Sequence, residues 1–369
     1  QTRERQSKRK IHPYLPQAKR GVADSDGPYV ISPYQTRNFR NRDVVNGTIM
    51  KKVSFAILFL LLATTLIFSQ AAQTKAVPVR IDAVPKKGFN FPYYLFVPDN
   101  VGDVDLKDLS PSLIVIPNNT GKLNDDISFH EDDVRRKIAQ IGPVLASSGV
   151  AAPVLVPVFP RPASENRIYT HSLDRDTMIV GGKDYRRLDL QLIAMIEDAR
   201  RRLKEQGVNI ADKVVMQGYS ASGMFVNRFV FMHPEKVKAA IIGAPGGWAI
   251  APVSTYDGKK LTYPAGVADL REVSGKRFDI DRVRKIPMLM VLGAEDTNDA
   301  VPMGDAYDKR ESDLVLTVFG KTPVERWPHT VKLYGQAKLN AEFKLYPATG
   351  HQMSPEMRQD MIAFLRKHQ

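Results

Sequence analysis

One stretch, residues 213–229, constrains the fold of the chain more tightly than any other. Residues 214–216 form a short apolar run, which is typical of a buried strand in a parallel sheet. From Ala221 onward the apolar residues follow helical spacing. Between the two lies Gly-Tyr-Ser-Ala-Ser, residues 218–222, whose small residues allow a strand to turn sharply into a helix. The sequence therefore predicts a strand–turn–helix unit with the hydroxyl of Ser220 exposed at its apex.

This unit meets the mechanical requirement of a nucleophile elbow, the turn that presents a reactive serine. It departs from the usual pattern at Ser222, where glycine is expected, and glycine follows as Gly223. Serine is small enough for the close contact between helix and strand, so we expect a tolerated variant. Ser222 is a poor alternative nucleophile, because Met224 stands two residues after it. A plain turn is the competing interpretation, and the flanking strand and helix favour catalysis.

The composition narrows the protein class. The 369 residues are 43% hydrophobic and include no cysteine. The chain can therefore bury a sizeable core, and it has no disulfide, thiolate metal site or cysteine nucleophile. We find no His-x-x-x-His pairing and no glycine-rich phosphate loop, so we expect no metal and no cofactor.

The front of the chain has the layout of an export signal. Residues 1–49 are polar and basic, Lys51 and Lys52 follow Met50, and an apolar run covers 56–68. Small residues then predict a signal peptide at 50–71, cleaved after residue 71. The apolar run is shorter than a spanning helix needs. We therefore expect a secreted or periplasmic protein that contacts a membrane only during export.

An internal signal peptide is unusual, and two interpretations remain open. Translation can start at Met50, which makes residues 1–49 an untranslated or disordered basic leader; alternatively, they form a cytoplasmic tail before an uncleaved anchor. In either case, the net charge of the remaining chain indicates whether a nucleic-acid partner is expected. Of the formal net charge of +13, residues 1–49 contribute ten basic against four acidic residues, and residues 51–52 add two more basic ones. About +5 remains for the rest, so we expect no nucleic-acid partner.

The remaining chain alternates between strand and helix patterns. An antiparallel hairpin is expected at 76–83 and 91–97, and a closing helix begins with Ser354 as its N-cap and Pro355 at its first position. Between them we expect strands at 112–117, 154–159, 214–216, 237–242, 288–292 and 341–346, and helices near 131–147, 188–206, 303–318 and 327–338, besides the helix that begins at Ala221. This alternation predicts an α/β fold, with a mainly parallel sheet and helices on both faces.

The leading hairpin, the serine after the fifth strand and the closing helix together resemble the α/β-hydrolase superfamily over residues 75–369. The resemblance implies a triad in the order serine, acid, histidine. His351, in the Ala-Thr-Gly-His turn after the last strand, matches the family's histidine. Asp296 lies three residues after Gly293 at a strand end, the family's spacing for the acid. Asp299, before Ala-Val-Pro, is the alternative acid, and we favour Asp296 because a strand end fixes geometry more directly.

The resemblance also implies an oxyanion hole. Its first donor is expected at the Ala221 N–H, at the start of the nucleophile helix. The second is expected at Asn119, because Pro-Asn-Asn-Thr-Gly, residues 117–121, resembles the Pro-Gly-aromatic-Thr stretch of secreted polyester-cleaving hydrolases. Asparagine replaces the aromatic residue, which puts a polyester substrate in doubt. We expect Tyr219 to contact the substrate. Trp248 is either a core aromatic residue or a wall of the substrate cleft, and we favour the cleft.

Further expectations concern histidines and substrate size. His233 is interpreted as structural and His130 as solvated, while His171 is expected either in the core or facing the site. Residues 249–284 mix aromatic and charged residues, which predicts a cap-like insertion over the cleft, with an ordinary crossover as the alternative. The whole pattern predicts a secreted serine esterase resembling polyhydroxyalkanoate depolymerases, acting on a small or oligomeric ester. A serine peptidase of the same fold and a catalytically silent binding protein remain the alternatives.

Overall fold

The computed structural model describes residues 77–98, 110–180 and 184–369, all of which belong to one unit spanning 70–369. The leader expected at 1–49 and the signal peptide expected at 50–71 lie outside the described residues. No helix in the part of the chain that the structure describes is both long and apolar enough to cross a bilayer.

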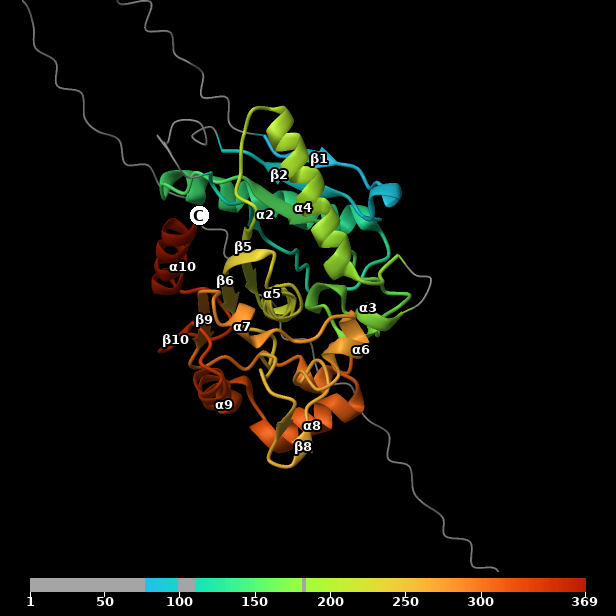
Figure 1. Cartoon of the computed structure of the whole chain (residues 1–369), viewed down its shortest axis with the longest axis vertical. Coiled ribbons are helices and arrows are strands. Elements are labelled where there is room, and N and C mark those ends of the chain that lie inside the picture. The colour runs from blue at the N-terminus through green and yellow to red at the C-terminus, as the bar shows by residue number, and fades with distance from the viewer. Residues whose placement is uncertain (1–76, 99–109, 181–183) are drawn as a thin grey trace, which may run out of the picture. The chain divides into compact units, whose positions relative to one another are not determined.

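Eight strands of the described residues form one sheet, in the spatial order β1-β2-β4-β3-β5-β6-β9-β10. From β4 onward the neighbours are parallel, while β1 and β2 pair antiparallel at one edge. Figure 1 shows β6, β9 and β10 following β5 in this order. The strands are β1 (Val79–Ile81), β2 (Tyr93–Phe96), β3 (Ile114–Val115), β4 (Val154–Pro157), β5 (Val214–Tyr219), β6 (Val237–Gly243), β9 (Met288–Gly293) and β10 (Ala341–Tyr346). The expected mainly parallel sheet with a leading hairpin is confirmed.

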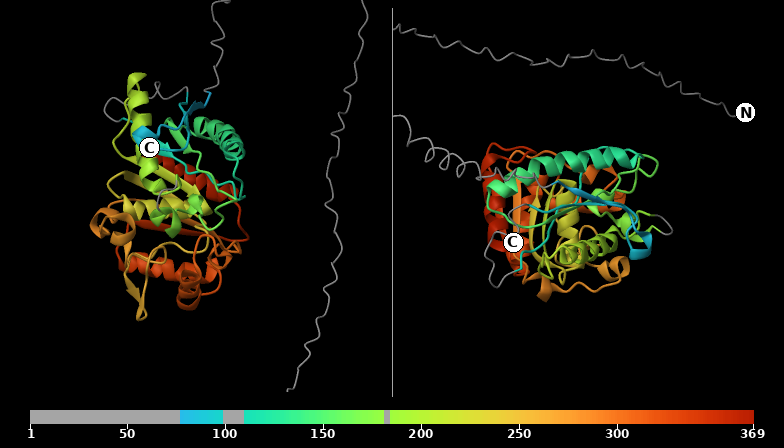
Figure 2. Two further views of the ribbon diagram at one scale, coloured as in Figure 1. Left: turned by 90° about the vertical axis from the view of Figure 1, so that its right-hand side faces the viewer. Right: turned by 90° about the horizontal axis from the view of Figure 1, so that it is seen from above.

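Helices cover both faces of this sheet, because successive side chains of a strand point to opposite faces. Val215 packs in one cluster with side chains of α2 and α10, whereas Val214 and Met216 pack in another with α4, α5 and α9. The right-hand view of Figure 2 shows α2 and α4 on opposite sides of the strands. The longer helices are α2 (Ile127–Ser147), α4 (Leu188–Glu205), α5 (Ala221–Met232), α8 (Lys309–Phe319), α9 (Pro323–Gln336) and α10 (Pro355–His368).

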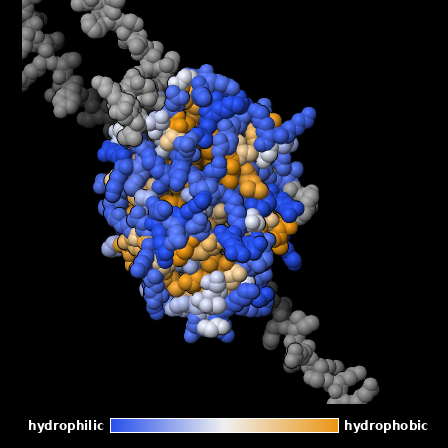
Figure 3. Space-filling view, viewed as in Figure 1, coloured by the Kyte–Doolittle hydropathy of each residue, from blue (hydrophilic) through white to orange (hydrophobic). Residues whose placement is uncertain are grey.

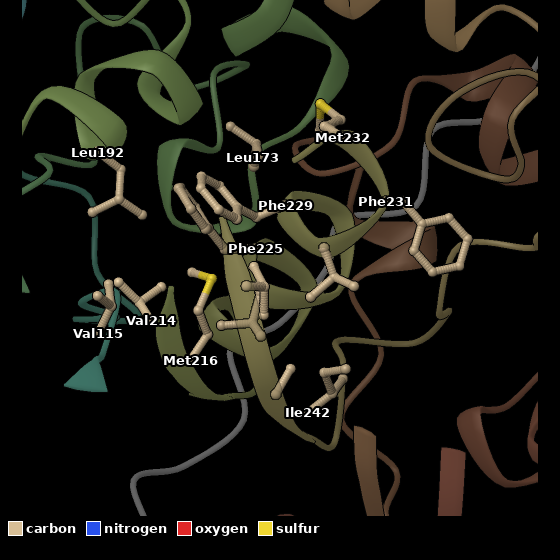
Figure 4. Close-up of a cluster of buried hydrophobic side chains, with 14 of the residues drawn as sticks. Val115, Leu173, Leu192, Val214, Met216, Phe225, Phe229, Phe231, Met232 and Ile242 are labelled. Atoms are coloured by element: carbon tan, nitrogen blue, oxygen red, sulfur yellow. The ribbon is translucent and has the colours of Figure 1, made fainter. Parts of the chain in front are cut away.

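The most buried helix is α5, all of whose residues are buried. Phe225 and Phe229 stack on one another and lie over β5, next to Met216, with Leu192 of α4 nearby (Figure 4). A fully buried Leu or Phe side chain contributes about 1.5–3 kcal/mol to folding. This packing holds the helix that follows Ser220 firmly against the centre of the sheet.

The segment 249–284, where a cap-like insertion or an ordinary crossover is expected, has little regular structure. It contains a short hairpin, β7 (Thr255–Tyr256) with β8 (Lys259–Lys260), and two short helices, α6 (Leu270–Ser274) and α7 (Ile280–Val283). Leu261, Tyr263 and Leu270 are buried in the hydrophobic clusters that also include α5. Apolar residues of the segment thus pack in the same core as α5, and the cap-like insertion stays a prediction.

The face of the molecule seen in Figure 3 is mainly hydrophilic, in contrast to the buried clusters. Hydrophilic residues predominate there, and the hydrophobic ones form separate patches between them. Scattered apolar residues of this kind are normal for a folded domain.

Candidate active site

Ser220 lies directly after β5 and is the N-cap of α5. Its backbone has φ 61° and ψ −127°, a region that residues other than glycine seldom adopt. Such a conformation costs on the order of 1–3 kcal/mol, which the surrounding packing has to offset. The Ser220 side chain does not cap the helix. The hydroxyl is therefore not used to satisfy the backbone, although the position normally favours that use.

Close backbone contacts explain the small residues around Ser220. A Cβ atom on Gly218 would lie 2.1 Å from the Ser222 carbonyl oxygen, and one on Gly223 would lie 2.4 Å from the Gly243 oxygen of β6. The close helix–strand contact is thus made at Gly223. Ser222 is buried, and its hydroxyl donates to the Tyr219 carbonyl at 2.9 Å and accepts the Tyr219 N–H at 3.0 Å. The Ser222 hydroxyl thus links the first turn of α5 to the backbone of the residue before Ser220.

His351 and Asp296 form a hydrogen-bonded pair at the ends of β10 and β9. His351 Nδ1 lies 2.9 Å from Asp296 Oδ2, and the other carboxylate oxygen accepts the Asn298 N–H. Asp296 is 1% exposed. A carboxylate in this position fixes the imidazole tautomer, leaving Nε2 as the free base.

The loops that carry these two residues touch through their backbones. The Glu295 N–H donates to the Thr349 carbonyl at 2.9 Å. A Cβ atom on Gly293 would lie 2.2 Å from the same oxygen, so only glycine permits the approach. The Gly293 that served as a landmark in the sequence therefore has a structural reason to be glycine.

Asp299, the alternative acid, pairs with Arg326 instead of His351. Arg326 Nη1 and Nη2 lie 2.8 Å from the two carboxylate oxygens of Asp299. The Val301 N–H also donates to Asp299. Arg326 was not predictable from the sequence, because the two residues are 27 positions apart and no spacing rule connects them.

The Tyr219 ring lies against the His351 imidazole. The two ring centroids are 5.4 Å apart, and the Tyr219 ring also packs against the hydrophobic core. Its hydroxyl is buried and has no hydrogen-bond partner among the described residues. Burial, and then the charge of Asp296, raises the pKa of Tyr219 above its ordinary value. The expected contact of Tyr219 with the substrate stays a prediction.

Trp248 departs from the expected cleft wall. It is 2% exposed, stacks on Phe319 at a centroid distance of 3.9 Å, and donates its indole N–H to the Ala265 carbonyl. Because its ring stacks inside a hydrophobic cluster and its indole N–H is bonded inside the protein, we assign it to the core.

The expected oxyanion donors lie at the start of α5 and on the loop that follows β3. No described residue accepts a hydrogen bond from the Ala221 N–H, at the first position of α5. Asn119 is partly exposed, and its side chain accepts the Gly121 N–H at 3.2 Å. Both donor assignments stay predictions.

Hydrogen bonds to buried groups fix the residues on either side of Asn119. The Asn118 side chain bonds both backbone groups of Phe159, and Thr120 bonds His130 at 3.1 Å. His130 is fully buried, so the expectation that it is solvated was wrong. His171 is fully buried as well, with Nε2 2.7 Å from the Phe159 carbonyl oxygen. His233 bonds the buried Asp189, in line with a structural role.

Arg161 fastens the outer end of the same loop and was not recognised from the sequence. It donates to the Gly121 carbonyl at 2.9 Å and pairs with Asp305. Its guanidinium lies 3.9 Å from the centre of the Tyr169 ring. Arg161 thereby connects the segments that follow β3, β4 and β9.

Comparison of the sequence with protein-family models and with curated proteins gives no match. Comparison of the structure does give matches. A poly(aspartic acid) hydrolase-1 from Sphingomonas sp. KT-1 superposes with a TM-score of 0.52 at 17% identity, covering 79% of this chain and 98% of that one. A poly(3-hydroxybutyrate) depolymerase from Bordetella parapertussis gives 0.48 at 16% identity, covering 80% and 91%. The sheet order, the serine turn after β5 and the likeness to the first of these two structures together show that the chain has the α/β-hydrolase fold.

Proposed function

We propose that this protein is a serine hydrolase that cleaves carboxylic esters. The observation that carries the proposal is the strained Ser220 at the end of β5, on the same sheet edge as the His351–Asp296 hydrogen bond. Parallel strands end at a common edge, which brings residues from distant parts of the chain together. A buried carboxylate, an imidazole and a serine held in a strained turn form the set that acyl transfer requires.

In the proposed mechanism, His351 Nε2 takes the proton of the Ser220 hydroxyl while the oxygen attacks the ester carbonyl. The carbonyl oxygen becomes negative and receives hydrogen bonds from the N–H groups of Ala221 and Asn119, each worth roughly 3 kcal/mol. His351 then passes its proton to the departing alcohol, which leaves Ser220 acylated. Water, deprotonated by the same imidazole, releases the acid and regenerates the enzyme.

Labelling with a fluorophosphonate probe tests the assignment of the nucleophile. We expect the wild-type protein to be labelled, and the Ser220→Ala variant to lose labelling and at least a thousandfold of its esterase activity. Ser222→Ala is the matched control, since it removes a neighbouring hydroxyl that bonds only the Tyr219 backbone. A labelled Ser220→Ala protein, or loss of labelling in Ser222→Ala alone, would overturn the assignment.

The choice between ester and amide substrates is tested on one panel. We expect p-nitrophenyl esters to be hydrolysed with a far higher kcat/KM than peptide amides. Poly(aspartic acid) belongs in the amide arm, because the hydrolase that gives the TM-score of 0.52 is named for it. Faster turnover of amides would make the protein a peptidase-type hydrolase, and a folded but unlabelled protein would favour the silent binding role.

The proposed substrate is a small or oligomeric ester, and no cofactor, metal or nucleic acid takes part. The series p-nitrophenyl acetate, butyrate, octanoate and palmitate measures the acyl size that the site accepts. We expect kcat/KM to be highest for the short and medium chains. A steady rise to palmitate, above all at an oil–water interface, would identify a lipase.

We further propose that the protein is exported, on the strength of the basic and apolar pattern at residues 50–71. N-terminal sequencing of the mature protein should give a first residue close to Ala72. A mature protein that begins before Met50 would contradict the export signal.

A further inference from the structure

Arg326 is one of the largest fully buried side chains of the described part of the protein, 1% exposed on helix α9. Its guanidinium has five N–H groups, and the structure provides five acceptors. Nε donates to the Gly320 carbonyl at 2.9 Å, and Nη2 donates to the Lys321 carbonyl at 3.0 Å. The remaining three bonds go to Gly247 and to both carboxylate oxygens of Asp299. Such complete satisfaction fixes the guanidinium in one position.

The Asp299 end of this contact lies on the short loop that carries Asp296. Asp299 is three residues after Asp296, and between them the Asn298 N–H bonds Asp296 at 2.9 Å. On the far side, the Val301 N–H bonds Asp299 at 3.0 Å. A displacement of Asp299 would therefore be passed along only a few bonds to the carboxylate that faces His351.

The Gly247 end lies on the segment that follows β6. Arg326 Nη1 is 2.9 Å from the Gly247 oxygen, and the Ala300 N–H donates to the neighbouring Gly246 carbonyl at 3.2 Å. This segment continues directly from Gly243, whose carbonyl accepts the Ser220 N–H at 2.9 Å. Arg326 thus fastens the Asp296 loop to the strand that also fastens the serine turn.

We propose that Arg326 and Asp299 are positioning residues that hold Asp296 in register with His351 and Ser220. This inference rests on the proposed serine hydrolase function. A buried ion pair adds little net stability compared with apolar residues of the same size. Its rigid two-point geometry is well suited to fixing a loop, and a misplacement of about 1 Å in a reacting constellation can reduce turnover about a hundredfold.

The test is a double-mutant cycle with Asp296→Asn. We expect Arg326→Gln to lower kcat for p-nitrophenyl butyrate at least tenfold, with little change in KM, because ester binding does not involve the pair. Fluorophosphonate labelling should slow by a similar factor. In the Asp296→Asn background, Arg326→Gln should lower the melting temperature again but leave kcat unchanged, because its effect on turnover passes through Asp296.

A second variant and a matched control keep the test decisive. Asp299→Asn keeps an oxygen for the Val301 N–H and should fold even if Arg326→Gln does not. The control is Arg187→Gln, which breaks a pair of the same two-point geometry, 3.0 and 2.9 Å to the buried Asp189, at the start of α4. It should lower the melting temperature while kcat stays at the wild-type value.

The outcomes separate cleanly. An unchanged kcat in both Arg326→Gln and Asp299→Asn, or losses that simply multiply in the Asp296→Asn background, would overturn the positioning role while the proposed function stands. An Asp296→Asn protein with wild-type kcat would overturn the proposed triad, and this inference with it.

Discussion

At the scale of single residues, His171 is the side chain whose burial has the clearest thermodynamic consequence. It is fully buried, and its Nε2 carries a hydrogen because the nearby Phe159 carbonyl can only accept. Nδ1 has no hydrogen-bond partner among the described residues. Burial lowers the pKa of His171 to about 3. The folded protein therefore excludes a proton that the unfolded chain binds below about pH 6.5.

This pKa predicts that the free energy of unfolding falls as the pH falls through 6.5 toward 3. Each pH unit in that window costs about 1.4 kcal/mol, so about 2 kcal/mol is lost by pH 5. His171→Gln removes the titrating group and keeps a donor for Phe159, so its stability should vary less over this range. Urea unfolding at pH 7.5 and pH 5 measures the free energy of unfolding of both proteins. An equal loss of this free energy between the two pH values in wild type and variant would contradict the prediction.

The residues of the candidate site were predictable to different degrees. Local rules were sufficient to place Ser220, His351 and Asp296, because each follows a strand end within a few positions. They were not sufficient for the stacking of Trp248, whose partner Phe319 lies 71 positions later in the chain. The contact between the Tyr219 and His351 rings was not predictable for the same reason, since the two residues are far apart in the sequence.

At the scale of elements, the loop between β3 and α2 is the part whose geometry should matter most for turnover. Arg161→Met removes the bond to Gly121 and the pair with Asp305. If the Asn119 N–H stabilises the oxyanion, kcat should fall about tenfold or more, in proportion to the misplacement of one donor. The measurement is kcat on p-nitrophenyl butyrate beside the melting temperature.

Arg175 offers a matched control for Arg161. It likewise bonds one carbonyl, that of Tyr263, and one carboxylate, that of Asp269. Arg175→Met should lower stability to a similar degree and leave kcat close to wild type. Equal losses of kcat in the two variants would mean that both arginines act only by holding the fold together.

Element ends were mostly predicted within a few residues. The Ser354–Pro355 start of α10 is confirmed, with Ser354 accepting the Met357 N–H. Helix α2 starts at Ile127, earlier than expected, because Asp126 and Asn124 form turns that the apolar periodicity does not reveal. The alternation of strand and helix could predict a parallel sheet, but not that β4 lies between β2 and β3. Strand order depends on contacts between distant segments, which leave no local mark.

At the scale of the whole molecule, the segment 249–284 contributes buried residues such as Leu261 to the core. Leu261→Ala should destabilise the protein by about 2–5 kcal/mol, the usual cost of truncating a buried leucine. A free-standing cap would instead change substrate preference with little loss of stability. Urea unfolding together with the acyl-chain series distinguishes the two, and a stability loss below about 0.5 kcal/mol would favour the free-standing cap.

The anchoring of the serine turn also creates a natural reporter of motion. The Ser220 N–H bonds the Gly243 carbonyl of the neighbouring strand. Its amide proton can exchange with solvent only when β5 and β6 part at that point. If the centre of the sheet opens only in global unfolding, this proton should exchange as slowly as the slowest in the protein. The reactive end of the elbow would then be among the most rigid parts of the backbone, although Ser220 is partly exposed.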